Sequence, residues 1–189
     1  MAGEIKTRDD AYKLLMNHIK TDYMIKHSVA TEAIMKELAK NLNQNVEKWG
    51  MAGLLHDLDF EETGEDPKKH TLVTEDILSG MGVDCEIIYA IKAHNAEGIG
   101  IERKSVFDYA LTCAESVTGL IVATALVLPD KKLSSVTAEA VIKKMKKKDF
   151  ARKVSRERIK DCDGTGLKLE EFMAIAVSAM QGISAELGL

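Results

Sequence analysis

Proline and cysteine, which interrupt or cross-link a fold, are scarce in this chain. Only 2 of the 189 residues are proline and 3 are cysteine, whereas 46% are hydrophobic and 30% are charged. Cys85, Cys113 and Cys162 form no Cys-x-x-Cys pair, which argues against a zinc ribbon, and their scatter argues against a secreted disulfide framework. We therefore expect reduced thiols and one globular, helix-rich unit over residues 1–189.

Targeting segments are also lacking. The first ten residues are charged where a signal peptide needs an apolar core, so a cytoplasmic location is expected. The long apolar run at residues 111–128 contains one charged residue, Glu115. Because a carboxylate is costly in lipid, this run is interpreted as a buried core helix and not as a membrane span.

Strand-like alternation is absent, and apolar residues recur at helical spacing, which predicts an all-α fold. Suitable N-caps and glycine or proline stops place the helices at about 8–18, 22–42, 46–57, 67–79, 85–94, 106–128, 137–148, 155–161 and 168–187. Within the third helix, Gly50, Ala52 and Gly53 would allow close packing against a neighbour.

Six potential metal ligands fall at the ends or buried faces of these helices: His27, His56, Asp57, His70, His94 and Glu115. Ligands far apart in sequence can converge inside a helical bundle. Imidazole with carboxylate suits Mn, Fe, Co, Ni or Zn better than Ca. On a regular helix the side chains of His56 and Asp57 point about 100° apart. Both can therefore face one metal centre only if that centre lies beyond the end of the helix. There, the Asp57 carboxylate could give one oxygen to each of two metals.

The strings that contain these residues resemble the H…HD…H…H…D pattern of the HD superfamily over about residues 22–128. They are His27-Ser-Val-Ala30, Ala52-Gly-Leu-Leu-His56-Asp57, His70-Thr71 and Ala90-Ile-Lys-Ala-His94-Asn95. The resemblance implies an HD-domain helical bundle, here with additional basic C-terminal helices at about 129–189. It implies His27, His56, Asp57 and Glu115 around one divalent ion and Asp57, His70 and His94 around a second, with Mg also possible.

Two positions depart from the family's usual pattern. Its last ligand is an Asp after Ala, whereas this chain has Ala114-Glu115, whose extra methylene moves the carboxylate by about 1.5 Å. The His-Asp doublet is usually followed by Ile-Gly and often Lys, but Leu58-Asp59 follows it here. The missing Lys argues against the cyclic-dinucleotide phosphodiesterase branches.

The resemblance implies a metal-dependent phosphohydrolase that acts on a small, nucleotide-like phosphate ester. Bound ions would lower the pKa of a water from about 15.7 toward about 7, and the hydroxide would attack phosphorus. Asp57, His56, His70 and His94 are thus the predicted catalytic residues, although His70 and His94 could instead grip phosphate. Asp59, Glu61 or Glu62 could protonate the leaving group, while surface or capping roles are otherwise expected for His18 and Asp59.

Other functions stay open. The HD site could bind a nucleotide or metal as a non-catalytic regulator, or its ligands could serve a di-iron oxygenase. No membrane partner is expected. The loops at about 58–67 and 95–104 contain no recognised base-reading motif, so the substrate is not identified from them.

Residues 131–160 contain twelve Lys or Arg against three acids. Nucleic-acid binding is disfavoured because Phe150 is the only interleaved aromatic residue. A solvated helix face is favoured. A further hypothesis is that one or two cations of this segment bind outer phosphates of the substrate at the site mouth, in which case mutating Arg152 and Arg156 to Ala should raise KM. The calcium-loop-like segment from Asp161 has Phe172 where the bidentate carboxylate belongs, so calcium is not expected there.

Overall fold

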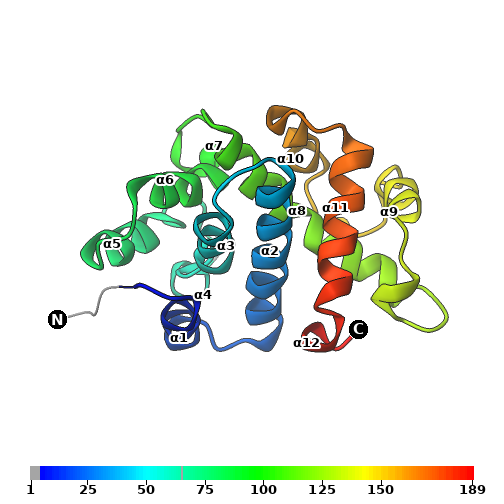
Figure 1. Cartoon of the computed structure of the whole chain (residues 1–189), viewed down its shortest axis with the longest axis horizontal. Coiled ribbons are helices and arrows are strands. Elements are labelled where there is room, and N and C mark those ends of the chain that lie inside the picture. Colours follow the sequence, from blue (N-terminus) through cyan, green and yellow to red (C-terminus); the bar gives the residue numbers. More distant parts are fainter. Residues whose placement is uncertain (1–4, 65) are drawn as a thin grey trace.

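The computed structural model describes residues 5–64 and 66–189, and every regular element in these ranges is a helix (Figure 1). The all-α prediction is confirmed. Residues 1–4, which begin the charged segment that argued against a signal peptide, lie outside the described residues, as does residue 65 in the predicted 58–67 loop.

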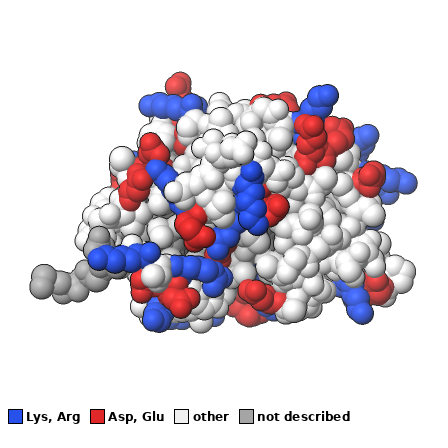
Figure 2. All heavy atoms as spheres, viewed as in Figure 1, with Lys and Arg blue, Asp and Glu red and all other residues white. Residues whose placement is uncertain are grey.

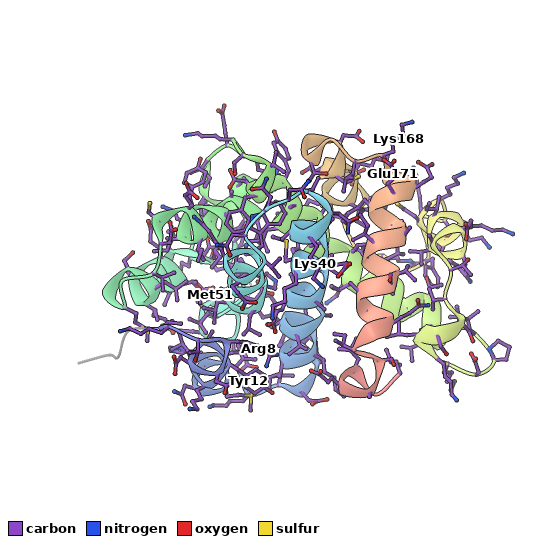
Figure 3. All side chains as sticks on the ribbon, in the orientation of Figure 1. Arg8, Tyr12, Lys40, Met51, Lys168 and Glu171 are labelled. Atoms are coloured by element: carbon purple, nitrogen blue, oxygen red, sulfur yellow. The ribbon has the colours of Figure 1, made fainter. Side chains whose placement is uncertain are left out.

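The first three helices begin at the predicted positions, and the first and third have the expected N-caps. They are α1 (Arg8–His18), α2 (Asp22–Asn41) and α3 (Val46–Leu55). The Thr7 and Asp10 side chains form a reciprocal capping box at the start of α1, and the Asn45 side chain accepts from Lys48 N at the start of α3. Arg8, labelled in Figure 3, reaches from α1 to Glu32 on α2, with Nε to Oε1 at 2.7 Å.

The next segment differs from the prediction at one helix start and in the two loops expected at about 58–67 and 95–104, each of which contains one short helix. It contains α4 (Phe60–Thr63), α5 (Leu72–Gly80), α6 (Cys85–His94) and α7 (Ala96–Ile99). The helix expected from Pro67 begins only at Leu72 because the buried residue before it, Thr71, has φ +77°. A β-branched residue rarely adopts this left-handed conformation, and it interrupts a continuous helix. His70 consequently lies in a turn before α5.

The long apolar helix α8 (Val106–Leu126) lies inside the bundle. By length and composition it could cross a membrane, but 67% of its apolar window is buried inside the fold. It packs against α2, α3 and α6 and against the C-terminal elements. Its start has the predicted cap, in which the Ser105 and Asp108 side chains form a capping box. This packing agrees with the interpretation of α8 as a core helix.

The C-terminal elements cover α2 and α8 from one side (Figure 1). They are η1 (Leu133–Ser135), α9 (Ala138–Met145), α10 (Arg156–Lys160), η2 (Asp161–Thr165), α11 (Leu169–Gly182) and α12 (Ser184–Leu187). The predicted last helix is interrupted at Ile183. At η2, Gly164 allows close contact with α8, because a Cβ there would lie 2.4 Å from the Tyr109 ring.

Close packing of α3 on α2 depends on Gly53. A Cβ at this position would lie 2.9 Å from Glu32 Cα and from the carbonyl oxygen of Thr31, both fixed in the α2 backbone. We expect Gly53→Ala to destabilise the protein by about 1–3 kcal/mol, measured as a lower midpoint of thermal unfolding by circular dichroism. Gly80→Ala, where an added Cβ meets nothing within 4 Å, is the control. Equal midpoints for the two variants would contradict the prediction.

Candidate metal centre

The helices bring five of the six predicted ligands to one point. The Nε2 atoms of His27 on α2 and His56 at the end of α3 lie 3.5 and 3.3 Å from Asp57 Oδ2. The Nε2 atoms of His70 before α5 and His94 at the end of α6 lie 3.2 and 3.3 Å from Asp57 Oδ1. Each oxygen of Asp57 therefore faces its own pair of imidazoles, which is the arrangement expected of a carboxylate shared between two ions.

Contacts on the far side of two of these rings assign the position of the ring proton. His56 Nδ1 lies 2.9 Å from the carbonyl oxygen of Gly53, and His94 Nδ1 lies 2.5 Å from that of Ile91. A carbonyl oxygen only accepts, so each Nδ1 is the donor. In the neutral ring, the Nε2 lone pair of His56 and of His94 must then point at Asp57.

His27 is oriented in the same way by a threonine of α8. The Thr118 hydroxyl donates to the carbonyl oxygen of Glu115 at 2.7 Å, so its oxygen can only accept from His27 Nδ1, 2.9 Å away. The His27 lone pair on Nε2 therefore also points at Asp57. From the sequence, no role was predicted for Thr118. The feature that could have indicated one is its position three residues after Glu115, which places both side chains on the same face of α8.

These donor atoms suit cations. The facing Nε2 atoms of His27 and His56 are 3.1 Å apart, and those of His70 and His94 are 3.0 Å apart. Two lone pairs and a carboxylate oxygen repel at such distances unless a positive charge lies between them. Ligands held about 2.0–2.2 Å from a transition metal are separated by roughly 3.0–3.6 Å. The residues present thus fit two ions, one held by His27, His56 and Asp57 and one by Asp57, His70 and His94.

Glu115, the sixth predicted ligand, is not brought into this cluster. Neither group of converging donor atoms found among the described residues includes it. Its Oε1 accepts from the Ser116 hydroxyl at 2.6 Å and lies 3.7 Å from Arg158 Nη1. A metal-ligand role for Glu115 therefore stays a prediction that this side-chain conformation does not support.

Comparison with known proteins agrees with the cluster. The family model described as HD domain matches residues 24–125, more than half of the chain. The chain belongs to the HD domain family. No solved structure matches it.

Curated relatives of the chain include Ribonuclease Y proteins. The chain is 30% identical to that of Desulfotalea psychrophila over 96 residues, 51% of this chain and 18% of that protein. It is 29% identical to the protein of Nitratidesulfovibrio vulgaris, strain DP4, with the same coverage. It is 35% identical to the protein of Thermosipho melanesiensis over 74 residues, which are 39% of this chain and 14% of that protein. The match thus spans less than a fifth of these relatives.

The electrostatics of the HD site also favour a cation. Burial alone would raise the pKa of Asp57, but the charge of His56 and hydrogen bonds from His27, His56 and His70 hold this pKa well below its usual range. Burial would lower the pKa of His70, yet Asp57 and Asp59 raise it to about 9. Burial lowers the pKa of His94. The centre therefore has a charged carboxylate that attracts protons, and a metal ion would displace such a proton on binding.

Asp59 is not at the surface, one of the two roles suggested from the sequence. It precedes α4 without capping it through its side chain, which instead accepts from an N–H in the first turn of α5. Its side chain is fully buried; Oδ1 lies 2.8 Å from His70 Nδ1, and Oδ2 accepts from Thr74 N at 3.0 Å. Carboxylates commonly orient metal-binding histidines from behind in this way. Asp59 is thus a positioning residue for His70, and the signal in the sequence was a carboxylate two residues after the His-Asp doublet of the HD domain.

The other two candidate acids also lie away from the cluster. Glu61 is exposed and accepts from the backbone N–H groups of Lys20 and Thr21, with the shortest distance 2.8 Å, so it stabilises the start of α2. Glu62 is exposed and does not line the cavity beside the metal centre. A general acid from this segment is therefore not supported.

A cavity of about 640 Å³ adjoins the metal centre of the HD domain. Two members of the centre, His27 and Asp57, lie in its wall together with Glu115. The wall also has apolar and basic residues, among them Met24, Val122, Val154, Leu187, Lys26, Lys153 and Arg158. A molecule bound in this cavity would contact the donor atoms and the C-terminal segment together.

Arg152 and Arg156, the two cations chosen to test the site-mouth hypothesis, are not in this wall. Arg152 is exposed and pairs with Asp149 at 3.2 Å. The guanidinium of Arg156 donates to the carbonyl oxygens of Ala151 and Val154 at 2.7 and 2.6 Å, so it braces a turn. Of the cations in this segment, Lys153 and Arg158 line the cavity, and phosphate binding by them stays a prediction.

Proposed function

We propose that this chain is a metal-dependent phosphohydrolase that cleaves a phosphate ester of a small, nucleotide-like molecule. The observation behind the proposal is that each Asp57 oxygen faces two imidazole nitrogens at 3.2–3.5 Å in the wall of a substrate-sized cavity. Bound divalent ions would supply an activated water and charge neutralisation for phosphoryl transfer.

The chain's own residues position these ions and the substrate. Thr118, Asp59 and two backbone carbonyl oxygens orient the four imidazoles before any ligand binds, which lowers the reorganisation that the reaction requires. His27 and Asp57 are accessible from the cavity, so a substrate phosphate would approach the centre from that side. We place this activity in the cytoplasm as part of the proposal.

RNA is a second substrate to test because several relatives are named ribonucleases, although the match covers only a small part of them. The face of the molecule drawn in Figure 2 gives little support for it. On the face in Figure 2, basic and acidic side chains are interspersed and form no continuous basic track, although a polynucleotide backbone requires one.

A non-catalytic regulator is the alternative function. It is favoured by the conformation of Glu115, which lies beside Arg158 and outside both groups of metal ligands. A protein that binds metal and nucleotide without turnover would have this function.

The decisive experiment uses protein depleted of metal by chelation and then supplied with Mn, Fe, Co, Ni, Zn or Mg. We expect at least one ion to restore hydrolysis of an aryl phosphate and of a nucleoside monophosphate, measured as released product, with elemental analysis giving the bound stoichiometry. The chelated protein is the control. Bound metal without turnover on any of these substrates would refute the hydrolase and support the regulator.

A further inference from the structure

Part of the cavity wall comes from outside the segment that matches the HD domain. The match ends at residue 125, whereas Lys153, Val154, Ser155, Arg158 and Leu187 line the cavity opposite α2. The C-terminal segment is held there by packing of α10 on α8 and of α11 on α2, and Ile159, next to Arg158, is fully buried. The position of this wall is therefore fixed by the fold.

The guanidinium of Arg158 is only partly used by the protein. Its Nη2 donates to Glu97 Oε2 at 2.9 Å, while Nη1 is 3.7 Å from Glu115 Oε1, beyond hydrogen-bonding distance. Among the contacts found in the described residues, none is a hydrogen bond from Arg158 Nη1 or Nε. These donors lie at the cavity wall on a side chain that is 29% exposed.

Glu97, which holds Arg158, is itself fixed by Arg103. The Arg103 guanidinium donates from Nη1 and Nη2 to the two Glu97 oxygens at 2.7 and 3.1 Å, and its Nε donates to Thr112 Oγ1 at 2.8 Å. Hydrogen bonding from Arg103, against the effect of burial, lowers the pKa of Glu97 to about 2. The Arg158 guanidinium is thus oriented in advance, which reduces the entropy lost when it binds an anion.

The rest of the wall suits a compact organic group. Met24, Val122, Val154 and Leu187 present aliphatic surface, and the volume of about 640 Å³ is that of a site for one small molecule. A single strand of RNA would need a groove with a succession of aromatic stacking surfaces. The cavity has two aromatic residues, Tyr23 and Phe60.

We propose that Arg158, assisted by Lys153, binds the phosphoryl oxygens of a phosphate ester the size of a mononucleotide, with the ester's organic group against the aliphatic wall. Arg158 would thus be a specificity residue supplied by the C-terminal segment. A guanidinium suits this role because its donors can pair with two phosphate oxygens at once. Turnover of such a substrate rests on the proposed function, whereas its binding does not.

The test compares four variants of the full, metal-loaded chain with the parent. Calorimetric titration with AMP and with inorganic phosphate measures binding, and KM and kcat are measured with AMP. We expect Arg158→Ala to weaken AMP binding and raise KM at least about tenfold, because a hydrogen bond to a charged group is lost, while kcat changes less. Arg158→Lys should be intermediate.

Arg152→Ala is the matched control, since it removes an exposed cation of the same segment away from the cavity. Glu97→Gln removes the carboxylate that holds Arg158 but leaves the cation in place. Arg152→Ala should bind AMP within about threefold of the parent, whereas Glu97→Gln should lose some affinity but less than Arg158→Ala, because the cation remains. If Glu97→Gln and Arg158→Ala lost the same AMP affinity, the role of Arg158 would be structural only. If Arg158→Ala bound AMP as tightly as Arg152→Ala does, the proposal would be overturned.

Two further outcomes separate this inference from the proposed function. AMP binding that depends on Arg158 without turnover would support the inference and refute the hydrolase. Hydrolysis that is insensitive to Arg158→Ala would support the hydrolase and refute the inference. Tighter binding of a single-stranded RNA oligomer than of AMP would overturn the proposed substrate size.

Discussion

Replacement of Asp57 by Asn is expected to reduce metal-dependent turnover at least about a thousandfold. Asp57 is the residue shared by both groups of donor atoms, and its carboxylate provides the negative charge at their centre. An amide of the same shape is neutral and offers only one oxygen, so neither ion would keep a charged ligand from this side chain. Because shape and burial are preserved, the loss should come from metal binding.

Metal content measured by elemental analysis and turnover of an aryl phosphate would check this prediction, with thermal unfolding as the measure of folding. Asp76→Asn, which neutralises an exposed carboxylate on α5, is the matched control and should retain both metal and activity. An Asp57→Asn variant that retained its full metal content and turned over within tenfold of the parent would contradict the site described above.

The convergence of the ligands could be predicted from sequence because it depends on helix positions. His27, His56 and His94 lie on helices whose ends were predicted within about two residues from caps and apolar spacing. The role of Asp57 as a bridge followed from its position beyond the end of α3. Helix periodicity and a bundle with inward apolar faces indicated that these residues could meet, whereas their assignment as ligands of two ions came from the resemblance to the HD superfamily.

Other features could not be predicted because they depend on tertiary contacts. The left-handed conformation of Thr71, which places His70 before α5, is contrary to the preference of threonine. Asp59 is an acid like its exposed neighbours Glu61 and Glu62, so the sequence does not distinguish it. Its burial is shown by the structure, in which its carboxylate contacts His70 and Thr74. Arg158 likewise resembles the other cations of the basic segment, and the cavity distinguishes it.

The burial of Asp59 leads to the second large expected effect. Asp59→Asn should lower metal affinity and turnover by about 10–100-fold, the range typical for partners that orient a metal-binding histidine. The carboxylate contacts His70 Nδ1 at 2.8 Å and accepts from Thr74 N at 3.0 Å, using one oxygen for each. An amide has one acceptor oxygen for these two donors, and its NH₂ group would face a donor. The imidazole of His70 would lose its fixed orientation.

The loss should fall on one ion more than on the other. His70 belongs to the group with His94 and Asp57, whereas the group of His27, His56 and Asp57 has no contact with Asp59 among those found. A metal titration of Asp59→Asn should therefore retain one site and weaken a second, while Glu62→Gln, a neutralised exposed neighbour, should leave both unchanged. Equal weakening of both sites would show that Asp59 supports the cluster as a whole, and unchanged binding would show that His70 needs no such support.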